Sequence, residues 1–252
     1  RVTFEVGMTQ LGGHAVYLSM QDIGLGKRES VSDVAQNLSR WVDGIAARTF
    51  VHQTAEELSK HSSLPVINAL SDHEHPCQAL ADLLTLQERG NGLSGSRLAY
   101  VGDGNNVCHS LMLLAAKLGM ETRVATPKGY EPKAAVLRRS EELARESGGS
   151  VLLTDDPALA VAQADAVYTD VWVSMGDEHE AEERAEVFRP YQVNGALFGL
   201  AKPTAVAMHC LPAHRGDEIT GEVVDGPRSV VLEQAENRPH AQKAVLVSLL
   251  GG

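Results

Sequence analysis

Short apolar runs alternate with segments whose apolar residues recur every three or four positions. In the second half of the chain such runs predict strands at 97–101, 121–125, 150–153, 166–168 and 205–208. The segments between these runs have helical spacing at 107–118, 132–146 and 157–164. Alternating strands and helices are typical of a parallel sheet covered by helices, so the pattern predicts an α/β fold.

The same alternation continues toward both ends of the chain. In the front part it predicts a buried strand at 15–18, a helix at 32–45, a strand at 65–70 and a helix at 76–88. Near the end it predicts a strand at 229–232 and a helix at 239–250. The turn-rich segment 90–95 is the best candidate boundary. We therefore predict domains at 1–89 and 90–233, with 234–252 a C-terminal segment and helix that pack back on the first domain.

Composition narrows the classes of partner. Hydrophobic residues make up 43% of the 252 residues, enough for one large core or two modest ones. The formal charge of -11 argues against binding to nucleic acid or to an anionic membrane, because both attract a clustered basic face. An odd, sparse set of cysteines (Cys77, Cys108 and Cys210) is typical of a reducing compartment, so we expect a cytoplasmic protein.

Polar clusters follow several of the apolar runs. Ligands of open parallel sheets bind beyond the carboxyl ends of the strands, and this rule selects the residues to consider. The clusters are Arg48-Thr49, His75 to Gln78, Asp103 to Asn106, Asp170 and His209-Cys210. Their shared position predicts a single cleft.

The segments 102–106 and 73–77 each allow two interpretations. Gly102-Asp103-Gly104-Asn105-Asn106 follows a strand and precedes a helix, which suggests a dinucleotide loop, but it lacks the third glycine of that motif. A tight turn whose asparagines line a pocket is the preferred interpretation. His73, His75 and Cys77 include competent zinc ligands. A neutral His75 at a helix start and a small buried Cys77 fit the intervening proline better, so we expect neither a metal nor a cofactor.

The last two clusters concern a loop and a thiol. Asp170 stands at a strand end before the glycine-broken segment 171–176, which is typical of a loop that closes over a ligand. His209 and Cys210 suggest a nucleophilic thiol. A nucleophilic cysteine needs an oriented base, and neighbouring residues on a strand point to opposite faces, so covalent catalysis is not favoured.

The segments HPCQ (75–78), DVWVSMG (170–176), HCLP (209–212) and AENR (235–238) resemble, in this order and spacing, the transcarbamoylase family and within it the ornithine carbamoyltransferases. The resemblance spans the chain. It implies two doubly wound domains with parallel sheets and an active site in the cleft between them. It also implies carbamoyl transfer from carbamoyl phosphate to the δ-amine of L-ornithine, giving L-citrulline and phosphate.

For carbamoyl phosphate the resemblance implies binding by the residues that match its motifs. These are Arg1, Arg48, His75, Pro76, Cys77, Gln78, Cys210, Leu211 and Arg238. Arg1 resembles the last residue of a Ser-Thr-Arg-Thr-Arg segment, so we expect the front part of the first domain to be missing. In this scheme Arg48 and His75 hold the phosphate and the carbonyl oxygen, and Gln78 reads the carbamoyl amide.

For ornithine the resemblance implies that Asn106 binds the carboxylate, Asp170 binds the α-ammonium, and Ser174 and Met175 belong to a closing loop. The implied catalytic residues are Arg48, His75, Asp170 and Cys210. The proton acceptor for the attacking amine stays open between Asp170, Cys210 and other groups.

One position departs from the family's pattern. The family usually has Gln or His before the Leu25-Gly26 pair, and that side chain reaches the phosphate in a neighbouring subunit, whereas this chain has Gly24. That contact is therefore either lost or supplied by another group, and the affinity for carbamoyl phosphate is the property that this difference would change. The resemblance also implies a homotrimer or a multiple of trimers.

Two other functions stay open at this point. A sister transcarbamoylase with putrescine or an acylated ornithine as acceptor would share the carbamoyl phosphate residues, although Asp170 with the 174–176 segment favours a free α-amino group. A non-catalytic ligand-binding relative would keep the cleft without turnover. A dehydrogenase is the weakest alternative.

Overall fold

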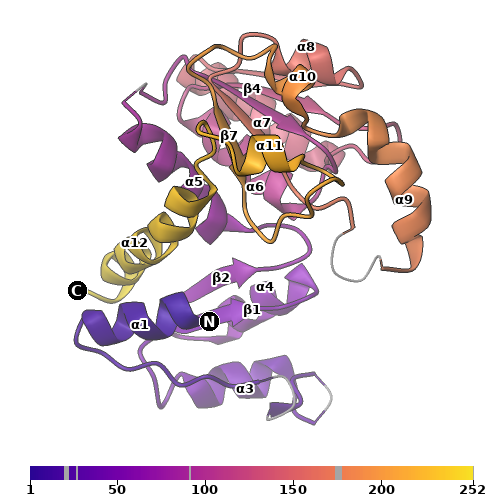
Figure 1. Cartoon of the computed structure of the whole chain (residues 1–252). Coiled ribbons are helices and arrows are strands. Elements are labelled where there is room, and N and C mark those ends of the chain that lie inside the picture. Colours follow the sequence, from indigo (N-terminus) through magenta and orange to yellow (C-terminus); the bar gives the residue numbers. More distant parts are fainter. Residues whose placement is uncertain (20–22, 27, 91, 174–177, 252) are drawn as a thin grey trace. The chain divides into compact units, whose positions relative to one another are not determined.

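The computed structural model describes residues 1–19, 23–26, 28–90, 92–173 and 178–251. The chain divides into two compact units. Unit 1 comprises Arg1–Cys77 and Arg238–Gly252, and unit 2 comprises Gln78–Asn237. Both chain ends therefore belong to unit 1 (Figure 1).

Unit 1 contains a small parallel sheet with helices around it. Its elements are α1 (Val2–Gln10), α3 (Val31–Leu38), β1 (Ile45–Arg48), α4 (His52–His61), β2 (Val66–Leu70) and the C-terminal part of α12 (Val231–Leu250). Strands β1 and β2 pair in parallel, with an irregularity in register between Ala47 and Arg48. Arg48 thus lies at the carboxyl end of its strand, where the regular pairing is interrupted.

Two apolar clusters form the core of unit 1. One joins Ala35 of α3, Ala47 of β1 and Leu58 of α4. The other joins Ile67 and Cys77 to Leu246 of α12, with Phe4 and Met8 of α1 packed against them, and α1 and α12 lie side by side in Figure 1. Residues from both ends of the chain therefore share one core.

Two predictions for unit 1 are wrong. Residues 15–18, all described, form no strand, and Val16 is 69% exposed. The helix predicted at 32–45 ends at Leu38. Its C-cap residue Ser39 donates its hydroxyl to the carbonyl of Ala35 and accepts from the backbone of Ser63. These bonds satisfy the helix end locally, and β1 begins only at Ile45, after the connection 39–44.

Unit 2 reproduces the predicted alternation of strands and helices. Its elements are α5 (Pro76–Glu88), β3 (Arg97–Val101), α6 (Asn106–Lys117), β4 (Glu121–Ala125), α7 (Ala134–Ser147), β5 (Ser150–Thr154), α8 (Pro157–Val161), β6 (Ala166–Thr169), η1 (Glu178–Glu180), α9 (Ala181–Phe188), η2 (Arg189–Tyr191), α10 (Gly195–Phe198), β7 (Val206–His209), α11 (Gly221–Val224) and the first part of α12. The predicted parallel α/β class is confirmed.

The order of the strands places the site of unit 2. The parallel sheet runs β5-β4-β3-β6-β7. The chain builds outward from β3 through β4 to β5, and then returns to the other side of β3 to add β6 and β7. The loops after β3 and β6 therefore diverge at a topological switch point, which is where open α/β sheets bind ligands.

Helices cover both faces of this sheet. Ala99 and Val101 point into a cluster that includes residues of α8, α10 and α11. Leu98 and Tyr100 alternate with them and point into a second cluster with residues of α5 and α6. A strand that is buried on both faces reads as a continuous apolar run, which explains why β3 is recognised from the sequence to the residue.

One prediction for unit 2 is wrong. The strand predicted at 229–232 is replaced by a single bridge between Ser229 and Ala207, and α12 begins at Val231. The predicted helix start at Pro239 lies inside α12.

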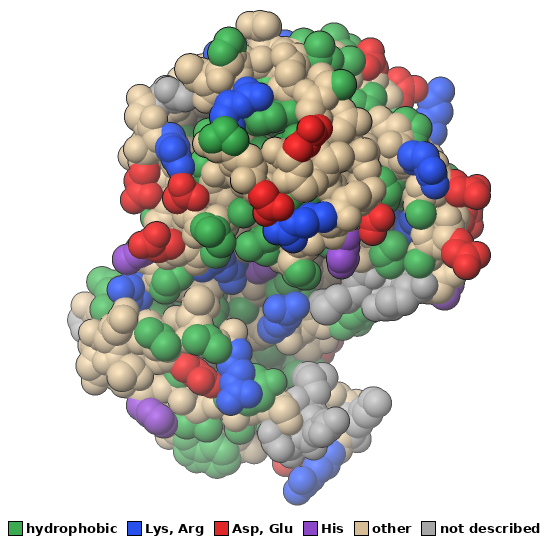
Figure 2. All heavy atoms as spheres, in the orientation of Figure 1, with side chains coloured by type: hydrophobic (Ala, Val, Ile, Leu, Met, Phe, Trp, Pro, Cys, Tyr) green, Lys and Arg blue, Asp and Glu red, His purple; other side chains and the backbone are tan. Residues whose placement is uncertain are grey.

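Within the described ranges, no helix is both long enough and apolar enough to span a membrane. On the face of unit 2 in Figure 2, basic and acidic side chains are interspersed.

Candidate active site

A closed turn after β2 leads to His75 at the start of α5. The backbone N–H of Ser71 donates to the carbonyl of Glu74 at 2.9 Å. The backbone N–H of Glu74 donates to the hydroxyl of Ser71 at 3.2 Å. These two bonds bring the chain from the carboxyl end of the strand to Pro76, the first residue of α5. Proline suits this position because the first helical N–H has no partner within the helix.

His75 is buried in unit 1, where the positive charges of Arg238 and Arg48 act on its imidazole ring. Burial, together with the positive charges of Arg238 and Arg48, lowers the pKa of His75 to about 3. An imidazole with such a pKa is neutral at pH 7. A neutral ring with an N–H can donate a hydrogen bond to a carbonyl oxygen, while the two guanidinium groups attract an anion. Unit 1 thus combines a neutral donor with positive charge.

Cys77 is part of the apolar core of unit 1. It is 2% exposed, and its thiol donates to the carbonyl of Asn68 at 3.6 Å. Burial raises the pKa of the thiol, against a smaller lowering influence of Arg238. The prediction of a small buried residue is confirmed, and a protonated thiol is a poor zinc ligand.

Gln78 begins the contribution of unit 2. It is 4% exposed, and its Nε2 donates to Oδ1 of Asp82 at 2.8 Å, one helical turn further along α5. Asp82 is fully buried. The sequence analysis missed Asp82, although a carboxylate among the apolar positions of α5 was a visible signal.

The loop after β3 is a tight turn filled by the chain itself. A Cβ on Gly104 would lie 2.3 Å from the backbone nitrogen of Pro132, so only glycine fits there. Asn105 caps α6, since its Oδ1 accepts from the backbone N–H groups of Val107 and Cys108. Asp103 forms a buried ion pair with Arg184 at 2.9 Å. This arrangement agrees with the tight turn rather than the dinucleotide loop.

Asp170, at the end of β6, is joined to that loop. The Nδ2 of Asn105 donates to its Oδ2 at 2.8 Å, and the backbone N–H of Val171 donates to its Oδ1 at 2.8 Å. Asp170 is 5% exposed. The bond between Asn105 and Asp170 bridges the two loops of the switch point. The sequence analysis placed Asn105 among asparagines that line a pocket but gave it no binding role, although its N-cap position was detectable.

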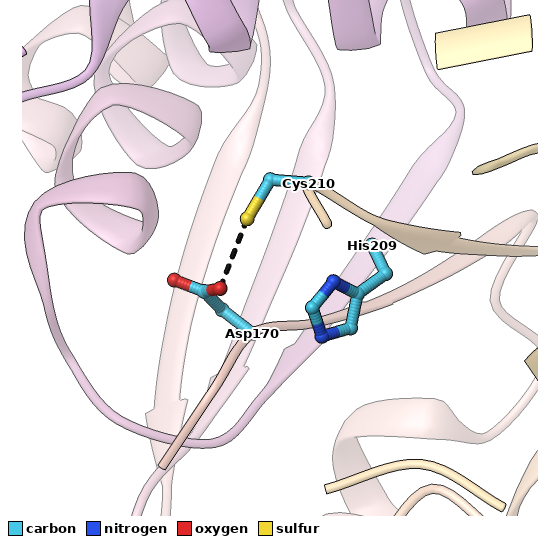
Figure 3. Close-up of side chains that lie close together, drawn as sticks. All are labelled: Asp170, His209 and Cys210. Carbon is cyan, nitrogen blue, oxygen red and sulfur yellow. Dashed lines mark hydrogen bonds between the residues drawn. The ribbon is translucent and has the colours of Figure 1, made fainter. Parts of the chain in front are cut away.

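Cys210 follows β7 and faces the same carboxylate. Its thiol donates to Oδ1 of Asp170 at 2.9 Å, as the dashed line in Figure 3 shows. Burial raises the pKa of the Cys210 thiol well above its usual value, and the charge of Asp170 raises it further. The thiol is therefore protonated at neutral pH, which supports the expectation that it is not a nucleophile.

His209 points elsewhere, although it precedes Cys210 directly. Its Nδ1 accepts the backbone N–H of Leu211 at 2.9 Å, so Nε2 carries the proton and donates to Glu218 at 3.1 Å. Burial alone would raise the pKa of Glu218, but bonds from His209 and from the backbone of His214 lower it overall. The pair holds the turn in which Leu211 adopts a φ of 59°. Glu218 was not recognised from the sequence.

Potential metal ligands come together in two places within the described part of the chain. They are Asp170, His209 and Cys210, and His214, Asp217 and Glu218. In the first group both ring nitrogens of His209 already take part in hydrogen bonds, and the thiol bonds to the carboxylate. The ligand atoms of His73, His75 and Cys77 form no such group.

The remaining predicted residues lie as follows. Arg1 occupies the N-cap position of α1 without a capping hydrogen bond from its side chain, and it pairs with Glu5 at 2.9 Å. Asn106 is the first residue of α6 and is half-buried. Ser174 and Met175 lie outside the described residues. Gly24 has a φ of 55°, a conformation in which the Gln or His expected from the family's pattern would be strained.

Comparison with known proteins follows the same division of the chain. Residues 1–88 match the carbamoyl-P binding domain of aspartate/ornithine carbamoyltransferases. Residues 94–249 match the Asp/Orn binding domain of the same enzymes. The two matches account for nearly the whole chain.

Individual relatives agree with these matches. An ornithine carbamoyltransferase of Anoxybacillus flavithermus is 58% identical over 99% of this chain and 80% of its own length. One of Pyrococcus horikoshii is 57% identical over 100% of the chain and 80% of its own length. The solved ornithine carbamoyltransferase of Pyrococcus furiosus has a TM-score of 0.97 at 56% identity, covering 100% of this chain and 80% of that one. That of Gloeobacter violaceus has a TM-score of 0.90 at 50% identity, covering 100% and 81%. The chain belongs to the aspartate/ornithine carbamoyltransferase family, on its ornithine carbamoyltransferase branch.

Proposed function

We propose that the chain transfers the carbamoyl group of carbamoyl phosphate to the δ-amine of L-ornithine, releasing L-citrulline and phosphate. The observation that carries the proposal is the neutral, buried His75 under the influence of Arg48 and Arg238. His75, Arg48 and Arg238 together suit a substrate with an anionic phosphate beside an uncharged carbonyl, because the arginines attract the anion and the neutral imidazole can donate to the carbonyl oxygen. The two matched domains and the names of the relatives support the same reaction.

In this proposal unit 1 takes the phosphate end of the donor. Arg48 and Arg238 bind phosphate oxygens, since guanidinium groups present paired N–H donors to them. His75 donates a hydrogen bond to the carbonyl oxygen, which becomes negatively charged as the amine attacks. Stabilising that oxyanion lowers the barrier, and no covalent intermediate with the protein is needed. Arg1, Pro76 and Cys77 complete the proposed set in unit 1.

In unit 2, Gln78 and the backbone carbonyls at Cys210 and Leu211 accept from the carbamoyl nitrogen. Asp170 binds the α-ammonium of ornithine, and Asn106 binds its carboxylate. Ser174 and Met175 are proposed to approach ornithine as well. The δ-amine attacks the carbonyl carbon only after losing its proton, because an ammonium ion has no lone pair. The C–N bond then forms and the C–O bond to phosphate breaks.

Three further properties are part of the proposal. The three cysteines are free, which suits the reducing cytoplasm. The similar Pyrococcus furiosus protein is named an anabolic enzyme, which supports the direction toward citrulline. We expect a homotrimer or a multiple of trimers, and light scattering, which measures the molar mass in solution, tests this expectation.

A colorimetric assay for citrulline tests the reaction. The protein is incubated with carbamoyl phosphate and ornithine, with parallel reactions containing putrescine or N-acetylornithine. We expect citrulline from ornithine and negligible product from the other two amines. Carbamoylation of putrescine without citrulline formation would overturn the acceptor, and the absence of any product would leave only a ligand-binding protein.

A further inference from the structure

A buried network in unit 2 centres on Asp82 of α5. Its Oδ1 accepts from Nε2 of Gln78 and from Nε2 of Gln234, each at 2.8 Å. Its Oδ2 accepts from the hydroxyl of Tyr168 at 3.0 Å. All four side chains are buried, and Asp82 is 0% exposed. Three neutral donors from α5, α12 and β6 thus converge on one carboxylate.

The network determines how the amide of Gln78 is turned. An ionised carboxylate has no hydrogen to donate, so the amide group that faces it is the NH2 and not the carbonyl. The side-chain amide is planar, with oxygen and nitrogen on opposite sides of its carbon. With Nε2 directed to Asp82, Oε1 of Gln78 points away from Asp82 and is oriented as an acceptor.

The same carboxylate reaches the turn after β7. Gln234 donates to Asp82 through Nε2, and its Oε1 accepts the backbone N–H of His209 at 3.0 Å. His209 directly precedes Cys210 and Leu211, whose backbone carbonyls are the other proposed acceptors. Asp82 is therefore connected by one amide to Gln78 and by another to this turn.

We propose that Asp82 is a positioning residue that selects the carbamoyl donor by its NH2 group. The inference rests on the proposed function, because it assumes that Gln78 and the Cys210-Leu211 carbonyls meet the carbamoyl nitrogen. An NH2 group has two hydrogens, and the network orients acceptors for them in two places, at Oε1 of Gln78 and at the carbonyls of the Cys210-Leu211 turn. A donor that carries a methyl group in place of NH2 leaves these oriented acceptors without a hydrogen bond from the donor.

Two stable probes separate this role from general stabilisation. Phosphonoacetamide carries the NH2 group, and phosphonoacetone carries a methyl group of nearly the same size in its place. Calorimetry gives the two dissociation constants, and their ratio measures recognition of NH2. We expect wild-type protein to prefer the amide by about tenfold, which corresponds to one or two neutral hydrogen bonds.

Asp82→Ala removes the acceptor, so the preference should fall by about three- to tenfold, mainly through weaker binding of phosphonoacetamide. Asp82→Asn is the matched control. Its oxygen can still accept from Gln78 and Gln234 while its NH2 donates to the Tyr168 hydroxyl, so it should retain most of the preference. An equal loss of affinity for both probes in Asp82→Ala would overturn the inference.

A second pair of variants covers the case in which Asp82→Ala fails to fold. Gln78→Glu places a carboxylate beside Asp82 and should lose the preference. Adding Asp82→Asn supplies an N–H to Glu at position 78, and should recover it. Retention of the preference by Gln78→Glu alone would overturn the role of Asp82. A wild-type protein that binds neither probe, or binds both equally, would instead contradict the proposed function of Gln78.

Discussion

The thiol of Cys210 donates a hydrogen bond to the carboxylate of Asp170 at 2.9 Å, joining the ends of β7 and β6. The sulfur acts here as a neutral donor, since burial and the neighbouring charge of Asp170 raise the pKa of the thiol. The carboxylate receives further bonds from Asn105 and from the backbone of Val171. Asp170 is thereby held in one orientation at the switch point of the sheet.

This arrangement predicts slow alkylation of Cys210. Only the thiolate reacts with iodoacetamide, and the raised pKa keeps its population small at pH 8. Mass spectrometry after a timed reaction should show modification at least about tenfold slower than that of a small-molecule thiol. Rapid modification of Cys210 in the folded protein would contradict the hydrogen-bonded, protonated state.

Substitutions at Cys210 test its part in turnover. Cys210→Ser keeps a hydroxyl donor for Asp170, whereas Cys210→Ala removes the donor. We therefore expect Ala to lower kcat/KM more than Ser, with measurable turnover in both because no covalent intermediate is involved. A complete loss of turnover in the serine variant, with folding intact, would point to a nucleophilic thiol.

Arg48→Ala should reduce kcat/KM for carbamoyl phosphate by about 100-fold or more, because phosphate and the developing oxyanion lose a fixed positive partner. Citrulline formation under varied carbamoyl phosphate measures the change. Arg40→Ala, which removes an exposed arginine of unit 1, is the matched control and should stay near wild type. A rate within about tenfold of wild type for Arg48→Ala would contradict the role.

His75 makes the stability of the protein depend on pH. Its pKa is about 3 in the folded protein, because of burial and the two arginines, against 6.5 for an unperturbed histidine. Between these values the unfolded chain binds the extra proton, so the free energy of unfolding decreases as pH falls from 6.5 toward 3. The slope from this group reaches about 1.4 kcal/mol per pH unit.

Chemical denaturation at several pH values, compared between wild type and His75→Asn, measures that slope. The variant should lose part of the dependence between pH 6.5 and the onset of acid unfolding. Replacing the exposed His61 by Asn serves as the control. Identical slopes for wild type and His75→Asn would show that His75 is not held neutral.

Gly104→Ala should destabilise unit 2 strongly. The added Cβ would lie 2.3 Å from the backbone nitrogen of Pro132. Because this neighbour is a backbone atom, no side-chain rotation can relieve the contact. We expect a loss of about 3 kcal/mol. Gly129→Ala is the control: its φ of 91° is strained for alanine, but no atom lies within 4 Å of the added Cβ. That loss should stay near 1 kcal/mol, and equal losses would contradict the steric argument.

The sequence predicted unit 2 better than unit 1. In unit 2 the central strands β3 and β6 are buried on both faces, so their apolar runs are continuous and bounded by turns. The strands β3 and β4 were placed to the residue. In unit 1, β1 follows α3 after the short connection 39–44, and the first residue of β1 was merged with the predicted helix. The run at 15–18 is apolar but exposed, and period alone does not distinguish such a run from a buried strand.

The candidate site shows a similar limit. His75, Asp170 and Cys210 stand at element ends, where polar residues after apolar runs are conspicuous in the sequence. Asp82 acts partly through a partner that is distant along the chain, Gln234. No local pattern reports a hydrogen bond that spans 152 residues. The carboxylate of Asp82 stands out among the apolar positions of its helix, but its bond to Gln234 becomes apparent only once the fold brings the two residues together.

The strand order β5-β4-β3-β6-β7 has a consequence for how this protein family diversifies. The loops that leave the switch point, after β3 and β6, are connections on the surface of a sheet whose two cores they do not build. If the proposed function holds, substitutions confined to these loops, apart from the closely packed Gly104, would alter the accepted amine and leave the strands and the proposed donor-binding residues of unit 1 in place. We therefore expect acceptor preference to be easier to change by substitution than the fold of the sheet.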